Sequence, residues 1–208
     1  MSRPTSFSAN AEPTNRSTRG VLDVRRASTR DVLPLMTRKP ITTRLARGAD
    51  ADTIAAIYNE GIADRIATFE TEPRTAAEIA ALLAGKHDRY PTIVAERDGR
   101  IVGWASASPY RSRPAYAGVA EHSVYVARAA RGSGVGRAAL DALCRTYAER
   151  GFWKLVSRIF SENIASLVLH ERCGFRVVGV YRRHAKLHGE WRDCVIVEKL
   201  IDGSERGL

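Results

Sequence analysis

The stretch VYVARAARGSGVGRAALDALC, residues 124–144, decides the fold of this chain. Val124 to Val126 have the character of a strand, and Arg131-Gly132-Ser133-Gly134-Val135-Gly136-Arg137 follows as a glycine-rich turn. Apolar residues then recur at helical spacing. Closely spaced glycines let backbone N–H groups approach an anion, and a helix N-terminus adds a partial positive charge. The stretch therefore predicts a strand, an anion-binding loop and a helix, with a purely structural glycine turn as the alternative.

The glycine-rich loop differs from two common phosphate-binding patterns. No Gly-Lys-Ser/Thr sequence follows it, which excludes a P-loop. Arg137 occupies the place of the third glycine in the dinucleotide fingerprint, which excludes that pattern as well. Arg131 and Arg137 flank the loop and would add positive charge to an anion site.

Strand-like and helix-like blocks alternate on both sides of this stretch. We expect strands over residues 41–46, 92–96, 101–108, 119–126, 154–160, 175–181 and 190–200. We expect helices over residues 54–62, 75–84, 139–147 and 164–173. Thr75 and Glu78 form a capping-box pattern at one helix start, and Asp98-Gly99 is a hairpin turn signal. The order predicts one mixed α/β domain without internal repeats.

The excess of positive charge gathers at the N-terminal end. The 208 residues carry a net charge of +10, and residues 1–42 hold eight basic against three acidic residues. This segment is rich in Ser, Thr, Asn and Pro, a composition that cannot support a packed core. We expect residues 1–40 to form a disordered basic leader and residues 41–203 to form the folded domain. An organelle-targeting segment, a nucleic-acid-binding arm and a dispensable extension remain open for the leader.

Two further features bound the class of protein. The longest stretch without charge, Ile101 to Tyr110, is far shorter than the about 20 apolar residues of a membrane-spanning helix, so we expect no membrane span. Cys144, Cys173 and Cys194 are odd in number and widely separated, which argues against a disulfide framework or a zinc site. We therefore expect a protein of a reducing compartment, the cytoplasm.

Several blocks together resemble one known superfamily. The Arg-x-x-Gly-x-Gly loop, Asn163 and the run His170-Glu171-Arg172-Cys173-Gly174-Phe175 resemble the acetyl-CoA pyrophosphate loop and the late helix of the GNAT acetyltransferases. Within that superfamily, the chain is most similar to the phosphinothricin and arsinothricin N-acetyltransferases. The blocks that carry this resemblance are Ile57-Tyr58-Asn59, Thr68-Phe69-Glu70-Thr71-Glu72-Pro73, Tyr110-Arg111-Ser112-Arg113-Pro114-Ala115-Tyr116, Ala120-Glu121-His122-Ser123-Val124-Tyr125-Val126 and His188-Gly189-Glu190-Trp191-Arg192-Asp193.

The resemblance covers residues 41–200 and implies a fold and a co-substrate. The fold is α/β, a mixed and splayed sheet with helices on both faces, and acetyl-CoA lies in its cleft. A homodimer is also implied. The implied cofactor-binding residues are Val124, Tyr125, Val126, Arg131, Gly132, Ser133, Gly134, Val135, Gly136, Arg137 and Asn163.

The resemblance implies that Glu121, within Ala120 to Val126, is the general base. A carboxylate can take the proton that an amine must lose before it attacks a thioester, directly or through water. Strand alternation places Ser123 and Tyr125 on the face of Glu121 and turns His122 to the other face. His122 is the local alternative base, because histidine titrates nearer neutrality. A solvated strand glutamate without a catalytic role is the other alternative.

His170 is the implied general acid. Many members of the superfamily carry a tyrosine four residues before the Gly-Phe pair, where it protonates the departing CoA thiolate. This chain has His170 there, as does the phosphinothricin branch. The alternative is a core-facing histidine of a helix that donates to a carbonyl group.

Arg111 and Arg113 are the candidate residues for the acceptor's anionic group. Guanidinium groups bind the paired oxygens of carboxylate, phosphinate or arsenic oxyanions in a bidentate manner that lysine cannot. Tyr116 and Phe69 are candidate walls of the same acceptor pocket. The alternatives are two solvated loop arginines and two aromatic residues that only pack. The block at 188–193 is expected to form a hairpin turn without a catalytic role.

These features predict direct transfer of acetyl from acetyl-CoA to the α-amino group of a small anionic amino acid such as phosphinothricin or arsinothricin. No cysteine stands where a covalent acetyl carrier would be needed. Another amine, such as methionine sulfoximine or a protein N-terminus, is the alternative acceptor. A nucleic-acid-binding module that uses the basic leader is the non-enzymatic alternative. We expect no nucleic-acid partner, because the leader lacks interleaved aromatic residues.

Overall fold

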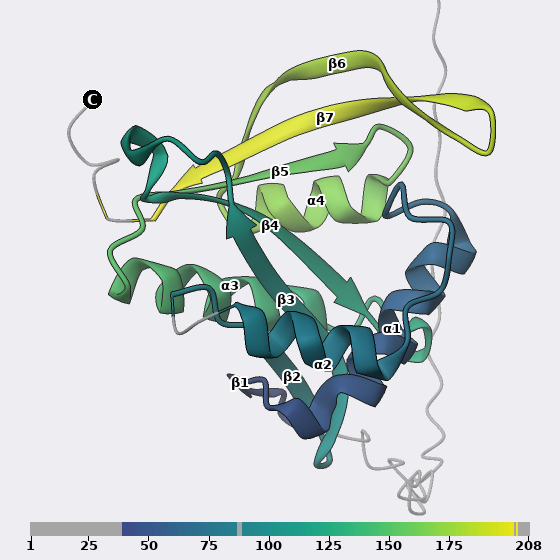
Figure 1. Ribbon diagram of the computed structural model, residues 1–208, viewed down its shortest axis with the longest axis vertical. Helices are drawn as coiled ribbons and strands as arrows, with labels where there is room; N and C mark the ends of the chain where they lie inside the picture. Colours follow the sequence, from purple (N-terminus) through teal and green to yellow (C-terminus); the bar gives the residue numbers. More distant parts are fainter. Residues whose placement is uncertain (1–38, 87–88, 202, 204–208) are drawn as a thin grey trace, which may run out of the picture. The chain divides into compact units, whose positions relative to one another are not determined.

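The computed structural model describes residues 39–86, 89–201 and 203, so the expected leader lies outside the described residues except for Lys39 and Pro40. The described part holds one seven-stranded sheet in the order β1-β2-β3-β4-β5-β7-β6 (Figure 1). The strands are β1 Thr42–Leu45, β2 Ile93–Arg97, β3 Arg100–Pro109, β4 Val119–Val126, β5 Lys154–Phe160, β6 Arg176–Leu187 and β7 Glu190–Leu200. The helices are α1 Ala51–Asp64, α2 Ala76–Gly85, α3 Val135–Glu149 and α4 Ile164–Arg172.

The sheet is mixed and splayed, as the sequence predicts. β4 and β5 run parallel, whereas every other neighbouring pair of strands is antiparallel. Their register spans only Val119–Glu121 against Lys154–Val156. Beyond these residues the two strands diverge, which Figure 1 shows to the right of β4. The divergence opens the sheet at the C-terminal end of β4, next to the glycine-rich loop.

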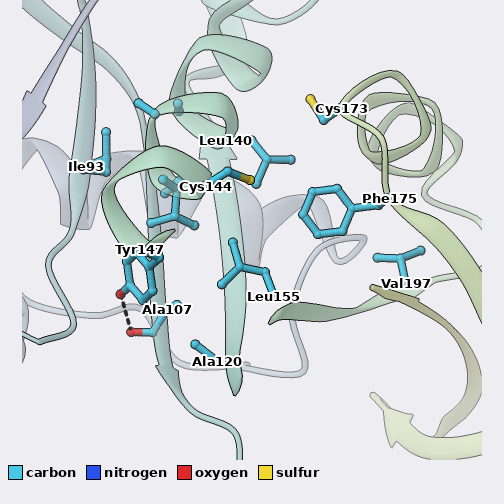
Figure 2. Packing of buried hydrophobic residues seen from close by; sticks show 14 of the residues in the cluster. Ile93, Ala107, Ala120, Leu140, Cys144, Tyr147, Leu155, Cys173, Phe175 and Val197 are labelled. Carbon is cyan, nitrogen blue, oxygen red and sulfur yellow. Dashed lines mark hydrogen bonds between the residues drawn. The ribbon is translucent and has the colours of Figure 1, made fainter. Parts of the chain in front are cut away.

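Helices cover both faces of the sheet, which confirms the predicted layers. On one face, Leu140 and Tyr147 of α3 pack with Ala120 and Leu155 of the strands. Figure 2 shows this packing, with the Tyr147 hydroxyl donating to the Ala107 carbonyl oxygen at 3.4 Å. On the other face, α1 and α2 pack against β2, β3 and β4; the buried residues there include Ile54, Ile57, Ile79, Val94, Trp104 and Tyr125. Each large apolar side chain that is fully buried contributes about 1.5–3 kcal/mol to folding.

The capping box of α2 and the Asp98-Gly99 turn form at the positions that the sequence predicts. The Thr75 hydroxyl accepts from the Glu78 N–H, and the Glu78 carboxylate accepts from the Thr75 N–H, so the capping box is present. Asp98 and Gly99 both have positive φ, 54° and 71°, in the tight turn between β2 and β3. These local bonds explain why the boundaries of α2 and of this hairpin are readable from the sequence.

β6 is longer than predicted, because it continues from Tyr181 to Leu187. The polar run after Tyr181 lacks the apolar alternation that marks a strand, and its pairing with β7 is irregular between Tyr181 and Ala185. Arg183 has a φ of 48° at this irregularity, and its N–H donates to the Asp193 carboxylate at 2.7 Å. The strand therefore depends on a partner in β7 that the local sequence does not reveal. The predicted turn at 188–193 is confirmed, since Leu187 pairs with Glu190.

None of the helices in the described ranges is long and apolar enough to cross a membrane. The three cysteines, Cys144, Cys173 and Cys194, are all buried as free thiols.

Candidate active site

A cavity of about 460 Å³ lies between the end of β4, the glycine-rich loop, α1 and α4. Its volume is within the range of small-molecule sites. Ten of the expected cofactor-binding residues line it: Val124, Tyr125, Val126, Arg131, Gly132, Gly134, Val135, Gly136, Arg137 and Asn163. Ser133 is the exception. Its backbone oxygen and hydroxyl accept from Arg97 at 3.1 Å, so its side chain ties the loop to β2.

The main chain of the loop has the conformation that an anion site requires. Gly134 precedes α3 with a φ of 89°, where a residue with a side chain would cost about 1–2 kcal/mol. The Ala138 N–H donates to the Gly134 carbonyl oxygen at 3.0 Å, so the N–H groups of residues 135–137 precede the helical hydrogen bonds. A Cβ at Gly136 would lie 3.0 Å from the Leu169 side chain, so a larger residue there would require Leu169 to shift. Free N–H groups at a helix start fit the diphosphate of a coenzyme.

Charged side chains fix the loop to α1. Arg131 lies 2.7 Å and Arg128 lies 2.6 Å from the Asp64 carboxylate oxygens. The hydrogen bond from Arg128 is the main reason that the pKa of Asp64 lies below its usual value. Arg137 remains mostly exposed, 3.5 Å from Asp141. Arg137 is thus the more available of the two flanking arginines, whereas Arg131 is already engaged by Asp64.

Asn163 links the cavity to the start of α4. Its side-chain oxygen accepts from the Ser166 N–H at 3.1 Å, which caps the helix. Its side-chain nitrogen donates to the Ile66 carbonyl oxygen at 3.0 Å. One side chain therefore holds the start of α4 against the segment that follows α1, and both segments line the cavity.

Glu121 lies on β4 at the point where β5 begins to diverge. Its carboxylate oxygen Oε1 accepts from Nε of Arg158 on β5 at 2.6 Å, and this hydrogen bond raises the pKa of Arg158. Glu121 borders one cavity of about 300 Å³ together with Tyr110, Arg111 and Arg158. It also borders a second cavity, of about 240 Å³, on the side of α2.

The second cavity contains a lysine that sequence reasoning missed. Lys86, just after α2, lines it with Glu121, Ser123 and Tyr125, which confirms that the three β4 side chains share a face. Burial lowers the pKa of Lys86 to about 8. Its ammonium group donates to the Ala107 carbonyl oxygen at 3.0 Å and to the Ser106 hydroxyl. Nothing in the local sequence around Lys86 distinguishes it from a solvated lysine.

His122 and His170 lie together on the opposite face of β4. Their Nε2 atoms are 3.0 Å apart, and Phe175 packs against both rings. His170 Nδ1 donates to the Ser166 carbonyl oxygen at 2.7 Å, so its Nε2 accepts from His122. Burial lowers the pKa of each imidazole and so favours its neutral form.

Neither histidine lines the cavity of about 460 Å³, called the cofactor cavity below, or the two cavities beside Glu121. His122 is therefore turned away from the face on which Glu121 lies, as strand alternation predicts. The geometry of His170 matches the core-facing alternative, and its role as general acid stays a prediction.

The expected acceptor residues separate into two groups. Arg111, Arg113 and Tyr116 surround a hollow of about 520 Å³ in the loop after β3, and Arg111 also borders the cavity of about 300 Å³ that contains Glu121. Phe69 lies elsewhere, with its ring centroid 4.6 Å from that of Phe160. The structure therefore brings Arg111 close to Glu121, but it does not bring Phe69 to the arginine loop.

Comparison with known proteins places this geometry in a family. The sequence matches the model of the acetyltransferase (GNAT) domain over residues 43–196. The chain is 38% identical to the phosphinothricin N-acetyltransferase of Alcaligenes faecalis, over 83% of this chain and 89% of that protein. It is 33% identical to the L-methionine sulfoximine/L-methionine sulfone acetyltransferase of Pseudomonas paraeruginosa, over 74% and 91% of the two chains.

A solved acetyltransferase structure from Salmonella typhimurium, determined with its cofactor acetyl-CoA, has the same fold. It is 30% identical, with a TM-score of 0.75 over 78% of this chain and 95% of that chain. The splayed sheet and the glycine-rich loop before α3 fit acetyl-CoA as the co-substrate. The chain belongs to the GNAT acetyltransferase family and is an acetyl-CoA-dependent N-acetyltransferase.

Proposed function

We propose that this enzyme acetylates the α-amino group of a small anionic amino acid of the phosphinothricin or arsinothricin type. The observation that carries the proposal is the cavity of about 300 Å³ that both Glu121 and Arg111 line. A carboxylate for the amine and a guanidinium for an acidic group are the two contacts that such an acceptor needs. The 38% identity to a phosphinothricin N-acetyltransferase supports the same substrate class. Such an activity would confer resistance to the unmodified compound.

Glu121 acts as the general base in this proposal. It takes a proton from the α-ammonium group through a water molecule, and the neutral amine becomes the nucleophile. Acetyl-CoA, when bound, supplies the thioester whose carbonyl carbon forms the new bond to nitrogen while its bond to sulfur breaks. Val124 to Val126 and the N–H groups of residues 132–137 hold the coenzyme in place. Protonation of the departing thiolate by His170 stays a prediction, because His170 lines none of these cavities in the structure.

Arg111 and Arg113 select the anionic end of the acceptor. The two arginines are separated by a single residue, in the loop before the strand that carries Glu121. Arg111 borders the Glu121 cavity, while Arg113 borders the hollow of the loop. Tyr116 borders the same hollow as Arg113. Phe69, which packs against Phe160, is proposed as a further wall of the acceptor pocket.

Methionine sulfoximine is the second candidate acceptor, because a relative that acetylates it is 33% identical. A protein N-terminus is a third, and it would need an open groove. The test is a thiol-release assay with acetyl-CoA and five acceptors: phosphinothricin, arsinothricin, methionine sulfoximine, a tripeptide and an uncharged alkylamine. We expect the highest kcat/KM for the first two. A preference for the tripeptide or the alkylamine would overturn the proposal.

The enzyme is proposed to act as a homodimer. On β6, at the edge of the sheet, Val177, Val178, Val180 and Tyr181 are each half or more exposed. A second copy on this edge would remove these apolar side chains from water. Sedimentation of the wild type and of Val180→Lys tests the interface, and we expect the variant to shift toward monomer. A monomeric wild type would contradict the proposal.

The remaining proposals concern the leader and the cellular location. The proposed catalytic domain comprises residues 41–203, and residues 1–40 are proposed to be dispensable for catalysis and to bind no nucleic acid. If the leader does bind nucleic acid, that binding weakens steeply as the salt concentration rises. Three buried free thiols support a cytoplasmic protein.

A further inference from the structure

Arg158 occupies the point at which the two central strands separate. Glu121 pairs with Val156 at the end of the parallel register, and Arg158 follows two residues later on the same face of β5. The Arg158 guanidinium bridges the opening to Glu121 through the 2.6 Å bond from Nε to Oε1. An oppositely charged pair thus includes the residue proposed as the general base, Glu121.

The guanidinium of Arg158 is only partly engaged. Its side chain is 49% exposed, whereas that of Glu121 is 25% exposed. Nη1 lies 3.4 Å from Nε2 of His184, and Nη2 donates to none of the described residues. Arg158 lines the cavity of about 300 Å³ together with Arg111. The terminal nitrogens of Arg158 leave donors for a bound anion.

The charges of this pair complement those of an α-amino acid. Such an acceptor carries its ammonium and carboxylate groups on one carbon atom, so both charges must be met at neighbouring points. We infer that Arg158 binds the α-carboxylate of the acceptor while Glu121 receives the ammonium group. Arg158 then makes the enzyme select free α-amino acids over amines that lack this carboxylate.

This inference rests on the proposed function and assigns the two acidic groups of the acceptor to two different arginines. The α-carboxylate is one carbon away from the reacting nitrogen, so a cation next to the base must hold it. Arg158 meets that condition through its direct contact with Glu121. Arg111, at the loop end of the same cavity, is placed for the distal acidic group. An exposed ion pair such as Glu121–Arg158 is weak, so an acceptor can open it at little cost.

A purely structural role for Arg158 makes a different prediction. If Arg158 only holds Glu121 in position, its loss slows every acceptor by the same factor. If it binds the α-carboxylate, its loss slows the free acid and leaves the corresponding amide nearly unchanged. The ratio of kcat/KM between acid and amide separates the two roles, because effects on Glu121 cancel in it.

The experiment uses the full chain with acetyl-CoA and two matched pairs: phosphinothricin and methionine sulfoximine, each with its α-carboxamide. We expect the wild type to favour each acid by roughly 10–150-fold, the value of one charge-assisted bidentate contact. Arg158→Ala should bring the ratio close to one, and Arg158→Lys should restore it only in part. Arg145→Ala, an exposed arginine of α3, is the control and should keep the ratio.

The possible outcomes distinguish a failure of the proposed function from a failure of the Arg158 inference. Acetylation of neither acid by the wild type overturns the proposed function and this inference with it. Acetylation of an acid with an unchanged acid-to-amide ratio in Arg158→Ala overturns this inference alone. Melting temperature and the KM for acetyl-CoA are measured in parallel, and a folded variant keeps both. If Arg158→Ala fails to fold, the ratio in the Arg158→Lys variant and in the wild type decides: an absent preference for the acid in the wild type overturns the inference.

Discussion

Two parts of the site differ in the residues that form them: the proposed cofactor half, the cavity of about 460 Å³, and the proposed acceptor half, the cavity of about 300 Å³. The proposed cofactor half is lined largely by one stretch within residues 124–137, whose free N–H groups would hold the coenzyme, and by Asn163 at the start of α4. The acceptor half uses side chains from separate elements: Glu121 on β4, Arg158 on β5 and Arg111 in the loop after β3. A main-chain site depends on backbone conformation and tolerates many side chains. A side-chain site depends on single charged groups, so single substitutions there should have larger and more selective effects.

The largest effect is expected for the base. Glu121→Gln keeps the size of the side chain and removes the proton acceptor, so turnover should fall by roughly 10²–10⁴-fold. The KM for acetyl-CoA should hardly change, because Glu121 does not line the cofactor cavity. Glu162→Gln is the control, since Glu162 forms a similar pair with Arg192 at 2.6 Å outside these cavities. Equal kinetics in Glu121→Gln and the wild type would show that the base lies elsewhere.

The next effect tests the arginine loop. Arg111→Ala and Arg113→Ala should raise the acceptor KM by roughly 10–150-fold through the loss of a charge-assisted contact. The lysine variants should rescue poorly, because they keep the charge and lose the planar guanidinium. Arg111 should be the more sensitive position, as it borders the Glu121 cavity. Steady-state kinetics with both substrates varied provide the measurement. A rise in the KM for acetyl-CoA instead would place these arginines in the cofactor half.

A smaller effect is expected in the cofactor half, where a substitution should change the KM for acetyl-CoA rather than the KM for the acceptor. Gly134→Ala should raise the KM for acetyl-CoA by roughly 5–30-fold, the equivalent of about 1–2 kcal/mol for a side chain at positive φ. The added Cβ would contact only Ile41 at 3.7 Å, so backbone strain is the cause. Gly99→Ala is the matched control, with a φ of 71° in the turn between β2 and β3. It should lower the melting temperature and leave both KM values unchanged.

The same contrast explains what the sequence reveals. The cofactor half is predictable because its parts are contiguous, so spacing alone places the glycines between a strand and a helix. In the acceptor half, Glu121 and Arg111 are found through the family resemblance, whereas Arg158 is not, because it reaches Glu121 only through the pairing of β4 with β5. Once that pairing is known, two-residue alternation places Arg158 on the face of Glu121. Lys86 depends in the same way on the burial that tertiary packing creates.

For two candidate residues, the family motif does not predict where the side chain lies. Phe69 lies within a block shared with the family, but its packing partner is Phe160 rather than the arginine loop. His170 occupies the place of the family's acid, but it lies in the core against His122. A motif fixes the element on which a residue lies, whereas the direction of its side chain depends on neighbours distant in the sequence.

The smallest effect is expected outside both halves. Deleting residues 1–36 removes six basic and three acidic residues and none of the residues that line the cavities. The deletion ends before Ile41, which packs against the core. Kinetic constants for both substrates should stay within roughly twofold at physiological salt. At low salt, a cationic segment attracts anionic acetyl-CoA over longer distances, so the truncated enzyme should then show a slightly higher KM for it. Loss of most activity at both salt concentrations would mean that the leader belongs to the site.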